Sequence, residues 1–382
     1  MTSLSWDSVL AWRLERQHLA ARAPRDAALA VVSDIAGLHA QVASCAELTL
    51  WARVDGLERG DVAELLWERR ALVKTWAMRG TLHLLAAAEL PRYVGALARL
   101  RPRHHVPAWL RAHGLEREQA EAMLAAIADS LRGADLTREE LAAKVAQRVG
   151  APDLAERLKG GFGDLLKPAA FTGDLCFAPS DGQRVRFTRP ADWLGGWEQV
   201  DGEQAGNEVV RTYLRAYGPA PREQFQRWFG MTSPAEAGRW IAALGDEVAE
   251  VDVEGDRGWM LAADVEAAAA AEPAGVVRLL PGFDHYVVAA PRAADAVLKG
   301  AHRERVYRPQ GWLSPALLAD GRILGVWSHE TGGDALRVAV EPFGRVPKHV
   351  RAGAEAEAER LASFLGLTLD LSFSSRRAAR TR

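Results

Sequence analysis

The sequence predicts an α+β protein, with three tandem winged-helix modules followed by a C-terminal β-rich module. Two observations carry this prediction. An order of three helical patterns and then a β-hairpin pattern recurs along the 382 residues, and after an alanine-rich stretch the chain changes to short apolar runs separated by glycine or proline. The expected modules are 1–114, which includes a basic extension, then 115–200, 201–265 and 274–373, with a basic tail at 374–382.

The third module shows this order most clearly. Helices are expected in NEVVRTYLRAYG, in PREQFQRWFG and in SPAEAGRWIAAL. In the last of these, Ser233 is expected as N-cap, Pro234 at the first helical position, and Glu236 as the residue that completes a capping box. EVAEVDVEGDRGWML then alternates about a Gly-Asp turn, which is typical of a β-hairpin.

The second module repeats the order. REQAEAMLAAIADSL and TREELAAKVAQRV predict two helices, the second of them capped by Thr137 and Glu140. A third helical pattern, DLAERLKGGFGDLLKPAA, is interrupted by glycines. DLCFAPSDGQRVRFTRP then predicts two strands around an Asp-Gly turn.

The first module fits the order more loosely, and the last module departs from it. Helices are expected near 4–21, 25–36, 44–54 and 61–69, followed by a hairpin, LVKTWAMRGTLHLL, that turns at Arg79-Gly80. An alanine-rich linker is expected near 264–275. Beyond it, VVRLLPGFDHYVVAAP, GWLSPALLADGRILGVWSHE and ALRVAVEPFG predict short strands, AGAEAEAERLASFLG predicts a helix, and LTLDLSF predicts a final strand.

Composition excludes several classes of protein. A formal net charge of −2 argues against a polycation, so any nucleic-acid surface must be a local basic patch. Two cysteines, Cys45 and Cys176, exclude a disulfide framework and a zinc site built mainly on thiolates. The sequence has no P-loop, no HExxH, no GxSxG and no His or Cys cluster with metal spacing, so we expect neither a metal nor a cofactor. With no signal-peptide pattern and no membrane-spanning run, we expect a cytoplasmic protein without membrane contact.

The segment IAGLHAQVASCAELTLWARV places His39 and Gln41 two residues apart in an apolar run. On a continuous helix their side chains would point about 200° apart and could not share a target. Gly37 predicts the end of one helix, and Ser44 with Glu47 predicts a capping box that opens the next. The intervening residues are therefore expected to be extended, with both side chains on one side. The alternative is a pair of polar linker residues that satisfy loose backbone groups.

A basic cluster is expected after the first hairpin, in RYVGALARLRPRHHVPAWLRAH. Its members include Arg99, Arg101, Arg103 and His104. Such a cluster suits a surface that clamps the DNA backbone, and a solvated helix end is the alternative.

Four motifs, GLHAQ, RGTLHLL, LLPGFDHYVV and DGRILGVW, occur in this order over nearly the whole chain. Together they resemble the HTH_42 superfamily of DNA glycosylases, which includes the AlkZ-like and YcaQ-like enzymes and is built from tandem winged helices and a C-terminal β-domain. The first motif reads Gln-x-Gln in AlkZ-like members and Gln-x-Asp in YcaQ-like members. Here Gln41 matches the AlkZ type, whereas His39 departs from both, as in an HxQ subgroup linked to removal of bulky antibiotic adducts.

The resemblance implies a monofunctional, cofactor-independent and monomeric DNA glycosylase. Its expected substrates are cationic alkylpurines in double-stranded DNA, including bulky N7-guanine adducts of genotoxic natural products, in repair or self-resistance. His39 and Gln41 would hold the attacking water, and a neutral His39 imidazole could accept its proton. The alternative function is a non-catalytic winged-helix transcriptional regulator, which usually dimerises on paired half-sites. A protein-interaction scaffold is a third possibility.

The other matched residues have two interpretations each. Alternation would place Arg79, Thr81 and His83 on one face of the hairpin, where they either contact the lesion strand or pack across the strands. Asp284 either orients a catalytic or DNA-contacting residue or forms a structural Asx turn. Trp312 and Trp327 are either core residues or stack on a base.

Overall fold

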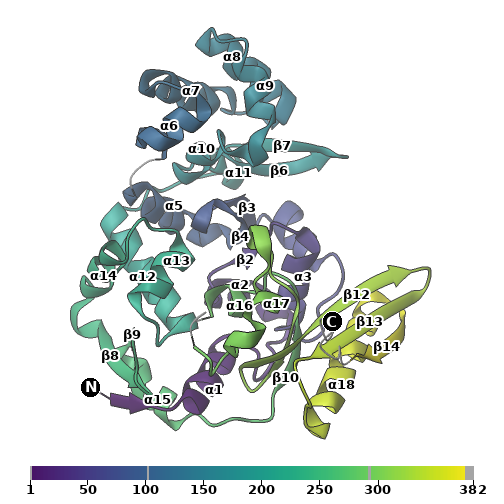
Figure 1. Ribbon diagram of the computed structural model, residues 1–382. Helices are drawn as coiled ribbons and strands as arrows, with labels where there is room; N and C mark the ends of the chain where they lie inside the picture. Colours follow the sequence, from purple (N-terminus) through teal and green to yellow (C-terminus); the bar gives the residue numbers. More distant parts are fainter. Residues whose placement is uncertain (1, 101–102, 291–293, 375–382) are drawn as a thin grey trace, which may run out of the picture. The chain divides into compact units, whose positions relative to one another are not determined.

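The computed structural model describes residues 2–100, 103–290 and 294–374. It is an α+β protein that divides into two compact units (Figure 1). Unit 1 consists of Met1–Val62, Arg211–Trp228 and Ser233–Arg382, and unit 2 of Ala63–Val210 with Phe229–Thr232. The first expected module, 1–114, is therefore divided between the two units, and the division into four modules stays a prediction.

Unit 1 begins with helices that surround the GLHAQ segment. These elements are β1 (Thr2–Leu4), α1 (Trp6–Arg16), α2 (Ala28–Asp34), β2 (Leu38–His39) and α3 (Ala43–Trp51). Helix α2 ends as expected, because Ala36 and Gly37 both adopt positive φ and the Gly37 amide donates to the carbonyl of Val32.

The central part of unit 1 contains three helices and a hairpin, as expected for 201–265. Its elements are α12 (Gly202–Tyr217), which begins in unit 2, α13 (Arg222–Phe229), α14 (Pro234–Ala242), β8 (Val248–Val253) and β9 (Asp256–Leu261). The predicted N-cap and first-turn proline are confirmed, since the Ser233 hydroxyl accepts from the Glu236 amide and Pro234 opens α14; the capping box with Glu236 stays a prediction. The hairpin turns at Glu254-Gly255 rather than Gly-Asp, and β1 pairs with β8 as a third strand.

The C-terminal part of unit 1 is a five-stranded sheet in the order β10-β11-β12-β13-β14. Its strands are β10 (Val277–Leu280), β11 (Ala316–Ala319), β12 (Arg322–Gly332), β13 (Ala335–Pro342) and β14 (Thr368–Phe373). Helix α18 (Lys348–Leu365) packs against β10 and β14, and the short α17 (Arg303–Val306) precedes β11. The predicted β-rich character is confirmed.

Two expectations for this region need correction. The first half of the expected linker at 264–275 is a helix, α15 (Val265–Ala270), which packs on α1, because alanine has a high helix propensity; the residues that follow it, 271–276, have no regular secondary structure. The strand in LLPGFDHYVV ends at Leu280, and after a turn the chain forms α16 (His285–Ala289), for which Asp284 is the N-cap.

Unit 2 begins with a hairpin. Its elements are α4 (Asp61–Ala63), which starts at the end of unit 1, a π-helical turn (Glu64–Glu68), β3 (Leu72–Trp76), β4 (Leu82–Ala86), α5 (Leu90–Arg99) and α6 (Pro107–His113). The hairpin prediction is confirmed, with Trp76 paired to Leu82 across a loop that contains Arg79 and Gly80.

The rest of unit 2 has the helix and strand order expected for 115–200. Its elements are α7 (Arg117–Ser130), β5 (Leu136–Thr137), α8 (Arg138–Val149), α9 (Leu154–Lys159), α10 (Lys167–Phe171), β6 (Cys176–Asp181), β7 (Arg184–Thr188) and α11 (Pro190–Leu194). The Thr137–Glu140 capping box of α8 and the glycine interruption after α9 are both confirmed. Trp76, Phe177 and Phe187 pack together in its core.

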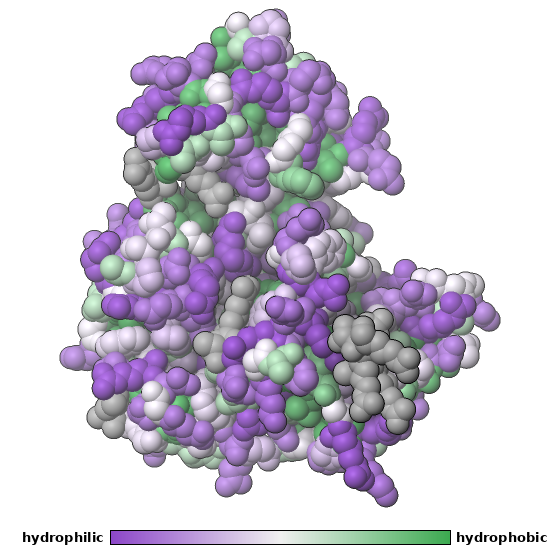
Figure 2. Space-filling model, viewed as in Figure 1, coloured by the Kyte–Doolittle hydropathy of each residue, from purple (hydrophilic) through white to green (hydrophobic). Residues whose placement is uncertain are grey.

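The visible surface is mostly hydrophilic (Figure 2). Among the described residues, two large hydrophobic side chains are largely exposed: Phe162, at 88%, and Trp312, at 54%. None of the helices in the described part of the chain combines the length and the apolar character needed to span a bilayer. Eight residues of the predicted basic tail, 375–382, lie outside the described residues.

Candidate active site

The segment that carries His39 and Gln41 is non-helical, as predicted. His39 ends the short strand β2, Gln41 follows in a bend, and α3 starts at Ala43. His39 is 5% exposed, whereas Gln41 is exposed. The buried imidazole is therefore held by its surroundings, and the neighbouring amide reaches solvent.

The expected capping box at the start of α3 is wrong. The helix begins one residue before Ser44, with Val42 as N-cap in extended conformation and no side-chain cap. Glu47 instead accepts a hydrogen bond from the amide of Gly60, at 3.3 Å, so its carboxylate is directed away from the helix start. The apolar run of α3 determines where the helix begins more strongly than the local capping signal does.

Phe283 covers His39. The two rings are stacked, with their centroids 5.0 Å apart and their planes 4° from parallel. Phe283 comes from the turn between β10 and α16, far from His39 in the sequence. The imidazole is thus fixed in orientation by an aromatic neighbour on one of its faces.

The turn that presents Phe283 has an unusual backbone. Phe283 has φ of 60°, a left-handed conformation that is costly for a bulky residue. The preceding Gly282 is needed for close packing, because a Cβ there would lie 3.0 Å from the carbonyl oxygen of Leu313. The surrounding structure therefore compensates for the strain that places the phenyl ring over His39.

Asp284 anchors this turn through a buried ion pair with Arg53. The distances are 2.7 Å from Nη1 to Oδ2 and 2.8 Å from Nη2 to Oδ1, and both side chains are fully buried. Oδ1 also accepts from the amide of Tyr286, at 2.8 Å, which is the Asx-type cap considered from the sequence. Arg53 follows α3, so the pair joins the helix next to Gln41 to the turn that holds Phe283.

Tyr217 links a further helix to the same place. Its hydroxyl donates to the carbonyl of Ile35, at 2.6 Å, and lies 3.1 Å from Nδ1 of His285. Ile35 precedes the GLHAQ segment and His285 follows Asp284. The end of α12 therefore fixes both segments that meet at His39.

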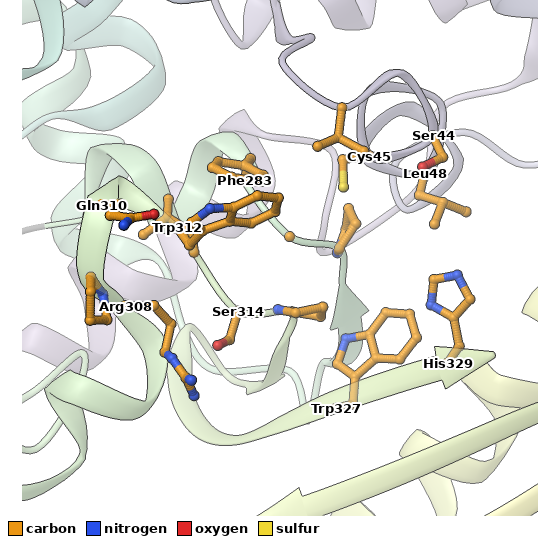
Figure 3. Close-up of a pocket in the computed structure, with 16 residues that line it drawn as sticks. Ser44, Cys45, Leu48, Phe283, Arg308, Gln310, Trp312, Ser314, Trp327 and His329 are labelled. Atoms are coloured by element: carbon orange, nitrogen blue, oxygen red, sulfur yellow. The ribbon is translucent and has the colours of Figure 1, made fainter.

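A pocket with a volume of about 680 Å³ lies beside Phe283 (Figure 3). Its walls come from α3, the Phe283 turn, residues 308–315 and β12. In Figure 3, Phe283 lies close to Trp312, with their ring centroids 5.2 Å apart, while Trp327 and His329 lie across the cavity from them. The remaining labelled lining residues are Ser44, Cys45, Leu48, Arg308, Gln310 and Ser314.

Two titratable groups of the pocket, Cys45 and His329, have pKa values shifted toward their neutral forms. Burial raises the pKa of the Cys45 thiol, and the nearby Asp284 carboxylate raises it further. His329 is an exposed residue, yet its imidazole stacks on Trp327 at 5.3 Å, and this partial burial lowers its pKa. Trp327 itself is 3% exposed, and its indole N–H donates to the carbonyl of Leu280.

The hairpin residues proposed to contact DNA lie in unit 2. Their expected alternation on one strand is wrong, because β4 begins at Leu82 and only His83 belongs to it. Arg79 lies in the loop with φ of 59°, and Thr81 Oγ1 donates to the Met78 carbonyl at 3.1 Å. His83 is fully buried, with Nδ1 2.9 Å from the Thr81 carbonyl oxygen, so it supports the loop from below.

Gly230 packs against the same loop. It has φ of 91°, and a Cβ at this position would lie 2.9 Å from the backbone of Arg79. The close approach fixes the position from which the half-buried Arg79 side chain extends.

The basic cluster also belongs to unit 2. Arg99 is exposed in the last turn of α5, and Arg101 lies outside the described residues. The backbone of Arg103 forms a 3-10 turn with the next two residues, and its side chain is outside what the structure describes. His104 is half-buried, and burial together with the neighbouring His105 lowers its pKa.

Sequence reasoning missed Arg53 and Phe283, whereas Trp312 and Trp327, which it considered as stacking residues, both line the pocket. Arg53 lies in an apolar pattern, where a fully buried arginine is rare unless it is paired, and its partner is 231 residues away. In the described ranges no group of three or more His, Cys, Asp or Glu side chains could hold a metal ion.

Comparisons with known proteins bear directly on this geometry. Residues 32–364 match the family described as DNA glycosylase AlkZ-like. The chain is 37% identical over 368 residues to an interstrand DNA cross-link repair glycosylase from Streptomyces sahachiroi, covering 95% of this chain and 97% of that protein. The solved structure of Streptomyces sahachiroi DNA glycosylase AlkZ is similar, with a TM-score of 0.88 and 36% identity, covering 98% of this chain and all of that one.

Proposed function

The chain belongs to the AlkZ-like DNA glycosylase family and is a hydrolase of N-glycosyl bonds, and on this premise we propose that it releases cationic N7-alkylguanines from double-stranded DNA. His39 and Gln41 are the catalytic residues of the proposal. What carries it is their placement: a buried imidazole stacked on Phe283 and an exposed amide two residues later, on a non-helical segment ahead of α3.

The chemistry is a hydrolysis at the anomeric carbon. The oxygen of water forms a bond to C1′ while the bond from C1′ to N9 breaks, and the electron pair of that bond returns to the purine. An N7-alkylguanine carries a positive charge, so this electron pair neutralises the leaving base. The water loses one proton, which passes to the His39 imidazole or to solvent.

The His39-Ala40-Gln41 motif contains no carboxylate, and this supports a cationic leaving group. Both oxygens of Asp284 accept hydrogen bonds from Arg53 within a fully buried pair, so this carboxylate is occupied in holding the turn. A pair of positioned acceptors can orient water, but it gives little help to a neutral leaving base. We therefore assign Asp284 a positioning role, through Phe283, rather than a role in activating water.

The related Streptomyces protein is named as an interstrand cross-link repair glycosylase. We extend that substrate to this chain as part of the proposal. Hydrolysis of one of the two N-glycosyl bonds of an N7-linked cross-link would leave the adduct attached to a single strand. Bulky N7-guanine adducts of genotoxic natural products carry the same charged purine and belong to the same proposed substrate class.

We further propose that the enzyme binds DNA as a monomer through winged-helix modules. The helix and hairpin orders in 115–200 and 201–265 support this for two modules. Arg79, Thr81, Arg99, Arg101, Arg103 and His104 form the proposed DNA-binding set, and His83, which is fully buried, supports the Arg79 loop instead of contacting DNA. Phosphate contacts from such arginines would supply affinity without sequence preference, as a repair enzyme requires.

The test is release of free base from duplex DNA that contains one N7-methylguanine, with Gln41→Ala as the matched control. We expect the wild-type protein to release N7-methylguanine and to leave uracil in an otherwise identical duplex. A transcriptional regulator would instead release neither base and would protect one defined sequence from nuclease digestion. Efficient uracil release would contradict the proposed dependence on a charged leaving group.

A further inference from the structure

We propose that the 680 Å³ pocket beside Phe283 binds the apolar, planar substituent of a bulky N7-guanine adduct while His39 and Gln41 act on the sugar bond. This inference rests on the proposed function and adds a binding site for the part of the lesion that is not a nucleobase. We call this cavity the adduct pocket and define it by Ser44, Leu48, Phe283, Trp312 and Trp327.

The adduct pocket is joined to the catalytic residues by one aromatic ring. Phe283 stacks on His39 and also contacts Trp312, with centroid distances of 5.0 Å and 5.2 Å. A group attached to a purine near His39 therefore needs to extend past a single side chain to enter the cavity. The order His39, Phe283, Trp312 forms a continuous aromatic path.

The backbone also connects the adduct pocket to His39 and Gln41. Helix α3 starts two residues after Gln41, and its first turns supply Ser44, Cys45 and Leu48 to the pocket wall. The proposed catalytic segment and this part of the pocket wall are thus consecutive in the chain. A ligand that packs on α3 is placed in register with His39 and Gln41, which is how binding energy from a remote group promotes reaction.

The size and chemistry of the adduct pocket suit a neutral, apolar ligand. Its volume lies in the range of about 300–1,000 Å³ that is typical of pockets for drug-sized molecules. The indole N–H of Trp327 is already bonded to the Leu280 carbonyl and the Ser314 hydroxyl to the Arg305 carbonyl. The walls therefore offer aromatic and aliphatic surface more than hydrogen-bonding groups.

An extruded nucleobase fits these walls less well. A base is normally recognised by hydrogen bonds along its Watson–Crick edge as well as by stacking. In the adduct pocket, Trp327 and Ser314 have their donors occupied, and the other polar side chains of the wall are Ser44, Cys45, Arg308, Gln310 and His329. Because most of the wall is apolar, the favoured occupant is a planar group that gains mainly from shape and stacking.

Trp312 is presented to solvent by a constrained loop. Tyr307 and Leu313 form a β-bridge, and between them Gln310 and Gly311 have φ of 59° and 80°. The indole is 54% exposed, although tryptophan is usually well covered in a folded protein. A strained loop that displays an exposed indole beside an apolar cavity is suited to stack on a ligand. The exposed Arg308 at the same loop suits a neighbouring phosphate.

The experiment compares two duplexes that differ only in the N7 substituent of one guanine: methyl, or pyren-1-ylmethyl. The readout is the ratio of the two excision rate constants at subsaturating enzyme. Trp312→Ala should lower the rate for the pyrenyl adduct relative to the methyl adduct by about tenfold or more, the usual effect of losing one stacking aromatic. Trp312→Phe should keep most of the wild-type ratio of pyrenyl to methyl rate constants. Ser44→Trp, which fills the cavity from α3, should lower this ratio relative to wild type.

Phe162→Ala is the matched control, because Phe162 is the other largely exposed aromatic of the described residues and does not line the pocket. It should leave the ratio unchanged. If the wild-type enzyme excises N7-methylguanine and neither Trp312→Ala nor Ser44→Trp changes the ratio, the pocket proposal is overturned while the proposed function stands. An equal loss for both duplexes, as expected for a nucleobase site, also overturns it.

If neither duplex releases base, the proposed function fails and the pocket is judged by binding alone. The free base N7-(pyren-1-ylmethyl)guanine is then titrated into wild-type protein and Trp312→Ala, with pyrene fluorescence as the readout. About tenfold weaker binding by the variant supports the pocket, and equal binding by the two proteins overturns it.

Discussion

The Phe283 ring lies parallel to the His39 imidazole, at 5.0 Å and 4°. The stack depends on a backbone conformation that phenylalanine rarely adopts, with φ of 60°, and on the buried pair of Arg53 with Asp284 next to it. His39, the proposed catalytic histidine, is therefore oriented by Phe283 and by the buried ion pair next to it. Substitutions at Phe283 and at Asp284 should therefore differ in how much they change the rate of base release and how much they change the free energy of unfolding.

Removal of the Asp284 carboxylate is expected to be severely destabilising. Asp284→Ala would leave the Arg53 guanidinium fully buried without its counter-charge, which typically costs about 3–5 kcal/mol. Urea denaturation measures this loss. The control is Asp129→Ala, which removes an exposed pair with Arg132 and should change stability by less than about 1 kcal/mol. Equal effects from the two variants would exclude a special role for the buried pair.

Two substitutions of Phe283 distinguish the effect of its ring on activity from the effect of its backbone strain on stability. Phe283→Gly and Phe283→Ala both remove the stack on His39, so both should slow base release. At φ of 60°, however, glycine is unstrained and alanine is not, so the glycine variant should be the more stable by about 1–2 kcal/mol. Thermal unfolding compares the two. An alanine variant at least as stable as the glycine variant would mean that the turn relaxes and stores no strain.

Local signals in the sequence predicted local structure well. Gly37 ends a helix, Thr137 with Glu140 caps another, and Ser233 with Pro234 starts a third, because each signal acts within a few residues of backbone. The interruption that places His39 and Gln41 outside any helix follows from the same kind of reasoning.

Tertiary contacts were beyond the reach of that reasoning. Asp284 was assigned a positioning or Asx-turn role, but nothing near it in the chain identifies Arg53 as its partner. The left-handed Phe283 is stable only because distant residues hold the turn, and its sequence favours no such conformation. The failure at Ser44 has the same origin, since packing of the apolar face of α3 overrides the capping preference.

The capping box of α8 predicts a pH-dependent contribution to stability. Hydrogen bonds from the Thr137 backbone and hydroxyl lower the pKa of Glu140 in the folded state. A lowered pKa means that this stabilisation is present above the unfolded value, about 4.3, and is lost as pH falls through the folded value. Thr137→Ala should therefore destabilise by about 1 kcal/mol at neutral pH and by less in acid, and Thr137→Ser should not. Because the backbone bond from Thr137 to Glu140 remains in Thr137→Ala, a cost independent of pH would exclude only the contribution of the hydroxyl bond to Glu140.

Neutralisation of the basic cluster tests the proposed contact with the DNA backbone. If Arg99, Arg101 and Arg103 bind phosphates, replacing all three by alanine should weaken binding to any sequence. Each lost contact should also flatten the slope of log affinity against log salt by about 0.9. Arg132→Ala, which removes an arginine already paired with Asp129, is the control. An unchanged slope in the triple variant would place the cluster outside the interface.

The proposed catalytic pair, His39 and Gln41, makes the sharpest prediction. Gln41→Ala should reduce single-turnover release of N7-methylguanine by roughly 10²-fold or more, the typical effect of losing a positioned polar group, while DNA affinity changes little. Because Gln41 is exposed, its replacement should not disturb the fold. His39→Gln keeps an acceptor at the buried position and should retain substantial activity, whereas His39→Ala should not. Wild-type rates in both alanine variants would identify the segment as a linker.

The dependence of the rate on pH then distinguishes the two roles of His39. If the imidazole accepts the proton of water, it must be neutral, so the wild-type rate should rise with pH through the range near 6.5 where histidine ordinarily titrates. His39→Gln has no titrating group at this position, and its rate should be flat from pH 5.5 to 8.5. If the wild-type enzyme is equally flat, His39 positions water only as a second acceptor beside Gln41. A rise that persists in His39→Gln would have to come from another group, and His39 would then have no part in proton transfer.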